Sequence, residues 1–386
     1  MAIEQPIDDR TSLDHELELD KFLRAAIKTR ASDLHLKVGQ PPKLRLYGQL
    51  KNTTGEIMTE KKIEQLVFEI LSPAQKEFFL KHGALDFAHE VDREHRFRTN
   101  IFRQRGTIGL AARRVDTIIP PFEELHLPQV LEKISDERGG LVIVAGPTGC
   151  GKTTTIASMI NYINRTRSCH IITIEDPIEY LFKDEKAIVS QREIGIDVKD
   201  FDEALTYLMR QDPDVVFIGE MRDAKTVAAG MRAAETGHLV FGTMHSTNAS
   251  QTVHRLLDMF PQVERDLVRQ TLSMTMKAII SQVLMPCLKE GVDRIPALEV
   301  LVANPAVKKL ITEGREVDLI SVIRSSQEDG MQDLTDNLCR LVEDGSIDPN
   351  KVAFHNLELE EAIGEARAYS SSAKEAVDCL MSLLRY

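Results

Sequence analysis

Residues 141–153 read L-V-I-V-A-G-P-T-G-C-G-K-T, and this stretch decides the fold. Five apolar residues typical of a buried strand lead into a glycine-rich loop, and helix-compatible residues follow up to Ile163. A strand, a glycine loop and a helix in this order form a phosphate-binding loop. The glycines let backbone N–H groups turn toward an anion, and the positive end of the helix dipole adds to the same field. The sequence therefore predicts a site for a nucleotide such as ATP.

The predicted phosphate ligands lie in one continuous segment. Lys152 is expected to reach the β- and γ-phosphates, and Thr153 is expected to hold Mg²⁺ through its hydroxyl. The full set of predicted nucleotide-binding residues is Gly146, Pro147, Thr148, Gly149, Cys150, Gly151, Lys152, Thr153 and Thr154.

Length, charge and cysteine usage limit the class of protein. The 386 residues exceed one ordinary core and predict two domains with a smaller C-terminal appendage. The formal net charge of −12 argues against a surface built for nucleic acid. Five scattered cysteines without a C-x-x-C pair fit neither a disulfide framework nor a zinc ribbon, and so favour a reducing cytoplasm. No apolar run reaches the roughly 20 residues that cross a bilayer, so any membrane association is expected to be peripheral.

Apolar periodicity divides the chain into five segments. Residues 1–18 form an acidic leader, and residues 19–115 mix helical and strand-like patterns, which predicts an α+β domain. Residues 116–128 contain three prolines and predict a stiff linker suited to limited hinge motion. Strands alternate with helical patterns in residues 129–294, which predicts an α/β domain on a largely parallel sheet. Residues 295–386 are mainly helical in pattern.

Two acidic motifs lie at the ends of predicted strands. Residues 173–179, T-I-E-D-P-I-E, gather three carboxylates that would repel one another without a cation or protons, although a solvated acidic turn is the alternative. Residues 215–220, V-V-F-I-G-E, are an apolar strand that delivers Glu220 where ligands gather in α/β sheets. This strand resembles a Walker B motif, with Gly219 in place of the usual magnesium-binding aspartate. Glu220 is therefore expected to act through a metal-bound water or to orient the attacking water.

Two histidines bracket another predicted strand in residues 237–245, G-H-L-V-F-G-T-M-H. A single histidine is commonly a structural residue, whereas His238 and His245 flank a strand expected beside the other motifs. We expect them to contact the γ-phosphate or the attacking water.

The four motifs, in this order, are similar to those of the type II/IV secretion ATPases. They are G-P-T-G-C-G-K-T-T-T, I-T-I-E-D-P-I-E-Y, V-V-F-I-G-E-M-R-D and A-E-T-G-H-L-V-F-G-T-M-H-S-T-N-A-S. The resemblance is strongest to the pilus retraction branch, PilT/PilU, and runs from about residue 20 to residue 345. It implies a homohexamer whose subunits have a PAS-like N-terminal domain and a RecA-like ATPase domain, with ATP held between them. It also implies functional roles for Lys152, Thr153, Glu179, Glu220, His238 and His245.

Arginines crowd the end of the predicted N-terminal domain, and a planar guanidinium suits phosphate. In the family this region faces the nucleotide, and Arg98, Arg105 and Arg113 stand where matching arginines occur. A solvated strand face is the alternative for at least half of the group. Its members are Arg93, Arg96, Arg98, Arg103, Arg105, Arg113 and Arg114.

The resemblance implies a cytoplasmic motor at the inner-membrane base of a pilus machine, which hydrolyses ATP to depolymerise pili during twitching motility. Its implied partners are an inner-membrane pilus platform protein and, as a possibility left open, a second retraction ATPase; no direct contact with nucleic acid is expected. Residues 286–291 hold one cysteine where extension-type relatives carry a four-cysteine zinc insertion, which favours retraction. Residues 305–314 resemble the retraction signature in their apolar spacing, while Lys309 and Thr312 depart from it.

Two other enzymatic functions remain open. An accessory PilU-like retraction ATPase is one, because some forty residues follow Gly345. A nucleic-acid translocase is the other, because RecA-like cores also serve that role, although the acidic balance disfavours it. A non-enzymatic ATP-gated scaffold is disfavoured by the intact loop, Glu220 and both histidines.

Overall fold

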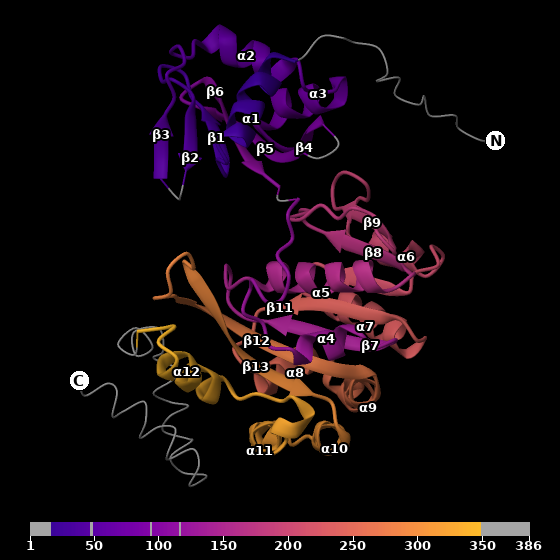
Figure 1. Ribbon diagram of the computed structural model, residues 1–386. Helices are drawn as coiled ribbons and strands as arrows, with labels where there is room; N and C mark the ends of the chain where they lie inside the picture. The colour runs from indigo at the N-terminus through magenta and orange to yellow at the C-terminus, as the bar shows by residue number, and fades with distance from the viewer. Residues whose placement is uncertain (1–16, 47–48, 93–94, 116, 349–386) are drawn as a thin grey trace, which may run out of the picture. The chain divides into compact units, whose positions relative to one another are not determined.

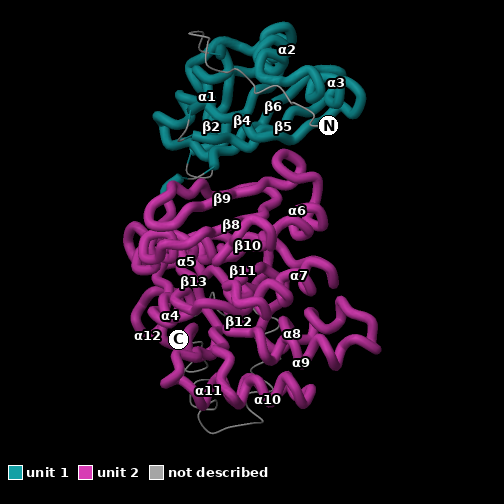
Figure 2. Tube along the Cα trace, turned by 90° about the vertical axis from the view of Figure 1, so that its right-hand side faces the viewer, with its two compact units in different colours: residues 1–118 teal, residues 119–386 magenta. Residues whose placement is uncertain are grey.

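The computed structural model describes residues 17–46, 49–92, 95–115 and 117–348, and the chain divides into two compact units. Unit 1 comprises residues 1–118 and unit 2 comprises residues 119–386 (Figure 2). Most of the expected acidic leader, Arg93 and everything after residue 348 lie outside the described residues. In the described ranges, no helix is long and apolar enough to cross a bilayer.

Unit 1 is, within its described residues, a six-stranded antiparallel sheet with helices packed on one face (Figure 1). Alternate strand residues such as Leu34, Leu110 and Phe97 are buried against apolar residues of the helices, because successive strand side chains point to opposite faces. The strand order is β3 (Gln49–Asn52), β2 (Lys43–Leu46), β1 (Asp33–Leu36), β6 (Thr107–Arg114), β5 (His95–Gln104) and β4 (Ala84–Asp92). The helices are α1 (Glu18–Lys28), α2 (Glu60–Phe68) and α3 (Pro73–His82).

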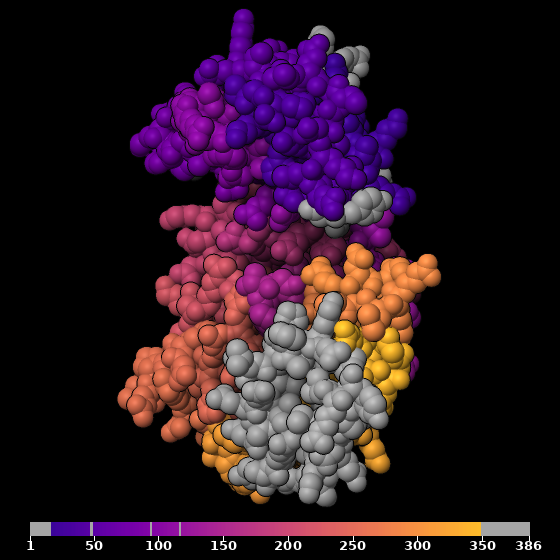
Figure 3. Space-filling model, turned by 90° about the vertical axis from the view of Figure 1, so that its left-hand side faces the viewer, coloured from indigo at the N-terminus to yellow at the C-terminus, as the bar shows by residue number. Residues whose placement is uncertain are grey.

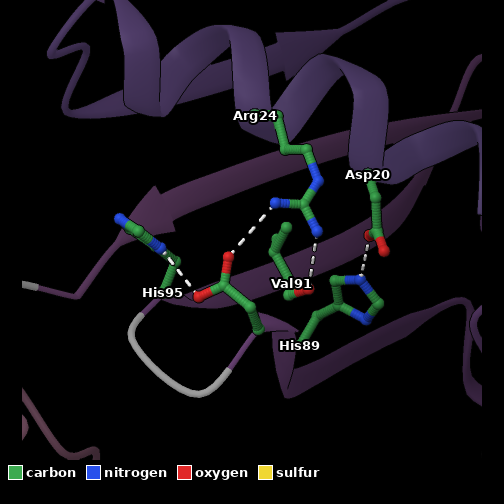
Figure 4. Close-up of polar contacts among 6 residues, drawn as sticks. Asp20, Arg24, His89, Val91 and His95 are labelled. Carbon is green, nitrogen blue, oxygen red and sulfur yellow. Dashed lines mark hydrogen bonds and ion pairs between the residues drawn. The ribbon is translucent and has the colours of Figure 1, made fainter. Parts of the chain in front are cut away.

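Polar contacts fasten α1 to the β4–β5 hairpin (Figure 4). The Nε2 atom of His89 lies 2.6 Å from Asp20 Oδ1, and both side chains are about nine-tenths buried. Arg24 pairs with Asp92 at 3.2 Å, and His95 Nδ1 lies 2.8 Å from the same carboxylate. These contacts fix the orientation of α1 on the sheet, because each hydrogen bond needs a defined geometry, which apolar packing does not.

Turn chemistry sets the remaining boundaries of unit 1. Helix α3 begins with a capping box between Ser72 and Gln75 and ends at Gly83, whose φ is 78°. The β5–β6 hairpin turns at Arg105 and Gly106, which both have positive φ, as a tight two-residue turn requires.

Unit 2 is built on a seven-stranded mixed sheet, and its parallel strands confirm the expected α/β class. Neighbouring strands are parallel throughout, except for the antiparallel edge strand β13. The C-terminal ends of the parallel strands therefore meet at one edge of the sheet. The order is β13 (Arg294–Val302), β12 (Met276–Pro286), β7 (Gly140–Ala145), β11 (Leu239–Met244), β10 (Val215–Ile218), β8 (His170–Glu175) and β9 (Ile188–Glu193).

Helices cover both faces of this sheet (Figure 1). In β7, Val142 and Val144 join one apolar core while Leu141 and Ile143 join the other, as expected for a strand buried on both faces. The first core includes α4 (Val130–Ser135) and α5 (Lys152–Thr166). The second includes α6 (Phe201–Leu208), α7 (Ala224–Glu235), α8 (Ala249–Asp258), α9 (Arg265–Thr275), α10 (Pro305–Glu313) and α11 (Leu319–Ser325).

The sheet extends past the boundary expected at residue 294. β13 pairs with β12 over its whole length, from Val302 opposite Ala278 to Arg294 opposite Pro286. The predicted start of a mainly helical region at residue 295 is therefore wrong, because the apolar run there is an edge strand, where Pro296 is tolerated. The last described helix, α12 (Leu334–Glu343), packs on the end of this hairpin, and the two lie side by side on the surface (Figure 3).

The prediction of a linker over residues 116–128 is also wrong for most of these residues. Unit 2 begins at Ile119, and Phe122 and Leu127 are only 5% and 8% exposed. Both side chains belong to the core that contains α4 and α5, and the Phe122 ring lies 5.6 Å from that of Tyr162. The prolines therefore stiffen a strap on the surface of unit 2.

Candidate active site

The phosphate loop joins β7 to α5 at the edge where the parallel strands end. Its glycines have positive φ values of 148° at Gly146, 79° at Gly149 and 90° at Gly151. Glycine adopts this backbone without strain, and such turns direct successive N–H groups toward an anion. The first N–H groups of α5 have no partner inside the helix, so they add donors at the same place.

Lys152 lies at the mouth of this loop. Its side chain is largely buried, and Nζ donates to the carbonyl oxygens of Gly146 at 2.8 Å and Pro147 at 3.0 Å. Burial lowers the pKa of Lys152, and the nearby negative charges of Glu220 and Glu179 oppose that shift. The loop cation and these two carboxylates are thus within electrostatic reach of one another.

Glu220 and His245 meet Lys152 from the two neighbouring strand ends. His245 Nε2 lies 3.3 Å from Glu220 Oε1, and His245 Nδ1 lies 3.5 Å from Lys152 Nζ. Because Lys152 can only donate, this geometry assigns the neutral tautomer in which Nε2 carries the proton toward Glu220. The structure therefore brings together three residues that were predicted from separate motifs.

Arg222 sets the charge state of Glu220. Its guanidinium donates to Glu220 Oε2 at 2.5 Å, and this bond, together with the positive charges of Arg222 and Lys152, holds the pKa of Glu220 below its usual range despite partial burial. A lowered carboxyl pKa means that Glu220 stays ionised at neutral pH and loses its charge only in acid. The residue is therefore suited to orient a water or a cation, as an anion.

The glycine that replaces the Walker B aspartate has a steric cause. A Cβ atom at Gly219 would lie 3.1 Å from the carbonyl oxygen of Ile174 and 3.3 Å from the Cα of Glu175. The segment is held at this distance by a bond from the Gly219 N–H to Ile174 and by the Thr243 hydroxyl, which donates to the Gly219 carbonyl at 2.5 Å. A side chain at residue 219 would require the end of β8 to shift by a few tenths of an ångström, so the close packing favours glycine there.

The acidic box separates into one buried carboxylate, Glu175, and two exposed ones, Asp176 and Glu179. Glu175 is 3% exposed, and burial raises its pKa to about 7, although bonds from Thr173 at 2.6 Å and Gln191 at 3.3 Å favour its charged form. Glu179 is exposed, and its charge contributes to the pKa of both Glu175 and Lys152. Mutual repulsion is thus relieved because Glu175 can hold a proton while Glu179 faces outward.

The structure does not bring His238 to the phosphate loop. His238 precedes β11 and His245 follows it, so about 23 Å of extended strand separates them. The ring of His238 instead contacts the carbonyl oxygen of Ala233 at 2.9 Å and the hydroxyl of Thr236 at 3.0 Å, at the end of α7. The predicted contact of His238 with the γ-phosphate of a nucleotide on the same chain is therefore wrong. Two residues that flank a strand lie at opposite edges of the sheet.

The predicted arginines of unit 1 are also divided. Arg98 and Arg113 lie directly opposite each other in the β5–β6 register, and Asp33 of β1 accepts from Arg113 Nε at 2.8 Å. Arg105 is instead at the tip of the β5–β6 hairpin, about 23 Å along the strand from Arg98. Arg103 stacks on Phe79 within the unit, which supports a structural role for that residue. Arg98 and Arg113 are thus cross-strand neighbours, whereas Arg105 lies at the far end of the same hairpin.

The other predicted loop residues contribute in different ways. Pro147, Thr148 and Gly149 are exposed, whereas Cys150 is 4% exposed and burial raises the pKa of its thiol. Cys150 therefore contributes main-chain atoms rather than a reactive side chain. The Thr154 hydroxyl bonds to the Tyr180 hydroxyl at 2.9 Å, which ties α5 to the acidic box.

These residues fit a nucleotide that arrives with Mg²⁺. The Thr153 hydroxyl and the Glu220 carboxylate are oxygen donors, which Mg²⁺ prefers. In the part of the chain that the structure describes, no group of three His, Cys, Asp or Glu side chains could hold a metal alone. Magnesium at nucleotide sites takes one or two protein ligands together with phosphate oxygens, so the donor set suits a nucleotide-bound cation.

The motifs did not identify the side chains that hold the site residues in place through hydrogen bonds. Arg222 stood in the quoted Walker B motif, and its spacing of two from Glu220 gave a usable signal. Gln282 gave none, because it lies more than a hundred residues after the loop that it contacts. Such partners become visible only when the strand order is known.

A phosphate loop, an ionised carboxylate and a histidine on adjacent parallel strands define a P-loop ATPase. A family model described as "Type II/IV secretion system protein" matches residues 120–354. The chain belongs to this family, and it is an ATP-hydrolysing enzyme of the retraction type.

Relatives cover nearly the whole chain. The "Type IV pilus retractation ATPase PilT" of Pseudomonas aeruginosa is 40% identical over 331 residues, which are 86% of this chain and 96% of that protein. The "Type IV pilus ATPase PilU" of the same organism is 37% identical over 331 residues, 86% of each chain. A crystal structure of the pilus retraction motor PilT with bound ADP has a TM-score of 0.79 and 44% identity, and covers 86% of this chain and 95% of that one.

Proposed function

We propose that this protein is a motor ATPase that hydrolyses ATP to drive retraction of type IV pili. The observation that carries the ATPase step is the meeting of Lys152, Glu220 and His245 at the phosphate loop, with contacts of 3.3 and 3.5 Å. The retraction role is supported by similarity to PilT over nearly the full length of both chains.

In this proposal each group has one task. Loop N–H groups and Lys152 hold the phosphates, and Lys152 leaves the carbonyls of Gly146 and Pro147 to do so. Glu220, kept anionic by Arg222, orients the attacking water or a metal-bound water, and His245 fixes its carboxylate through Nε2. Mg²⁺, held by Thr153 and Glu220, would neutralise charge on the phosphates.

Assembly and partners extend the proposal. We infer a homohexamer in which arginines of unit 1, with Arg98 and Arg113 as the first candidates, supply charge to a nucleotide bound by unit 2. The finer fold assignments, a PAS-like unit 1 and a RecA-like unit 2, and the role of Glu179 belong to the same proposal. The proposed location is the cytoplasmic base of a pilus machine, where an inner-membrane platform protein receives the motion and provides peripheral membrane association.

An accessory PilU-like role is the second candidate. PilU of Pseudomonas aeruginosa is 37% identical, close to the 40% of PilT, so identity alone does not separate the two. Deletion of the gene decides between them: loss of all pilus retraction supports the main motor, and weakened retraction supports the accessory role. ATPase activity that requires added DNA would instead support a nucleic-acid translocase.

Two substitutions test the ATPase step. Lys152→Ala removes the cation from the β- and γ-phosphates and is expected to weaken ATP binding and to abolish turnover. Glu220→Gln keeps the shape and loses the charge, so it should bind ATP within about threefold of wild type and lose roughly 10²–10³ in kcat. Near-normal hydrolysis by Glu220→Gln would rule out its role. Lys133→Ala, at an exposed position on helix α4, is the matched lysine control and should hydrolyse ATP normally.

A further inference from the structure

The side chain of Gln282, on β12, forms hydrogen bonds with the phosphate loop and with α5. Its side chain is 3% exposed and lies among buried groups. Its Nε2 donates to the carbonyl oxygen of Cys150 at 2.6 Å, and its Oε1 accepts from the hydroxyl of Thr155 at 2.7 Å. One amide therefore holds the loop and the first turn of α5 together.

The backbone of the loop is shaped around this residue. A Cβ atom at Gly146 would lie 2.4 Å from the carbonyl oxygen of Gln282, and a Cβ atom at Gly151 would lie 2.9 Å from its Nε2. Both glycines also have positive φ, so two independent constraints exclude side chains there. The close approach of β12 is thus one reason why the loop needs glycine at both positions.

The bond to Cys150 fixes the direction of a neighbouring donor. The peptide between Cys150 and Gly151 is trans, and a trans peptide places its carbonyl oxygen and its N–H on opposite sides. Because Gln282 holds the Cys150 carbonyl toward β12, the Gly151 N–H points away from β12.

We propose that Gln282 is a positioning residue, which aims the Gly151 N–H at a nucleotide phosphate by holding the Cys150 carbonyl. The inference rests on the proposed function, since the direction of this N–H matters only if the loop binds a nucleotide. An amide suits the task because it donates and accepts at the same time; a carboxylate can only accept, and an apolar side chain does neither. Gln282 itself need not touch the nucleotide.

The test compares two variants of the full-length protein with a neighbouring control. Gln282→Met keeps side-chain volume and loses both hydrogen bonds, and Gln282→Glu keeps the acceptor and loses the donor. Ser281→Ala is the control, because Ser281 is 1% exposed on the same strand and its Oγ has no hydrogen-bond partner among the described residues. Binding of ATP and of ADP is titrated by fluorescence with labelled nucleotides, and KM and kcat are measured with ATP.

We expect both Gln282 variants to fold, to bind ATP and ADP about tenfold more weakly and to raise KM by a similar factor, with kcat within about threefold of wild type. A packing role would leave Gln282→Met unaffected, because its volume is conserved. Affinity within twofold of wild type in either folded variant would overturn the proposal. Failure of both variants to fold would assign the amide to general stability and would also overturn it. A wild-type protein that binds neither nucleotide would refute the proposed function instead.

Discussion

At the scale of single residues, the two histidines that bracket β11 have different surroundings. His245 contacts Glu220 and Lys152 at the phosphate loop, whereas His238 contacts the end of α7 at the other edge of the sheet. We expect His245→Ala to lower kcat roughly 100-fold, because Glu220 loses the group that orients it. His238→Ala is the paired variant and should keep kcat within about threefold of wild type.

Steady-state ATPase assays on the two histidine variants are the measurement, with circular dichroism to confirm folding. An equal loss in both would mean that His238 acts on a site outside its own chain. A loss in His238→Ala alone would reverse the assignment made from the structure.

The candidate site was predictable where its residues are local in sequence. The phosphate loop and Glu220 each follow an apolar strand, so strand ends could be placed without coordinates. Gln282 could not be found this way, because its contact with Cys150 depends on β12 pairing with β7. The wrong prediction for His238 has a related cause. The two residues that flank a strand are separated by the full length of that strand.

At the scale of elements, sequence patterns predicted the strands beside the motifs and missed others. The apolar runs at residues 141–145, 215–218 and 239–243 are strands in the structure, whereas β9 and β12 were not predicted as strands. The two boundary errors, at residues 116–128 and 294, came from reading prolines as linker signals and an apolar edge strand as helical. Proline fixes φ equally in a linker and in a strap packed on a surface, so local sequence cannot separate them.

Packing of the strap, residues 119–128, is expected to contribute to the stability of unit 2. Phe122 is 5% exposed in the core with α4 and α5, so Phe122→Ala should destabilise unit 2 by about 3–5 kcal/mol and lower its thermal midpoint. Ile118→Ala is the matched control, because Ile118 lies four residues away and is 82% exposed. Thermal unfolding followed by circular dichroism measures both. Equal and small effects would show that the strap is a free linker after all.

At the scale of the whole molecule, each unit carries part of the proposed chemistry. Unit 2 contains the loop, Glu220 and His245, and unit 1 contains the paired arginines Arg98 and Arg113. Binding energy can become motion only if the nucleotide prefers one arrangement of the units over another. Arginines on one unit and a phosphate loop on the other are a chemical basis for such a preference.

This division predicts how an isolated unit 2 behaves. A fragment of residues 119–386 keeps the strap that packs on its core, and should therefore fold and bind ATP within a few-fold of the full chain. It should hydrolyse ATP roughly 10³-fold more slowly, because an arginine supplied to the γ-phosphate typically contributes 10³–10⁵ in rate. Full-length Arg113→Ala should approach the fragment, whereas Arg103→Ala, whose guanidinium stacks on Phe79, should keep the full-chain rate. Hydrolysis by the fragment at the full-chain rate would remove unit 1 from the catalytic step and leave it as a transmitter of motion alone.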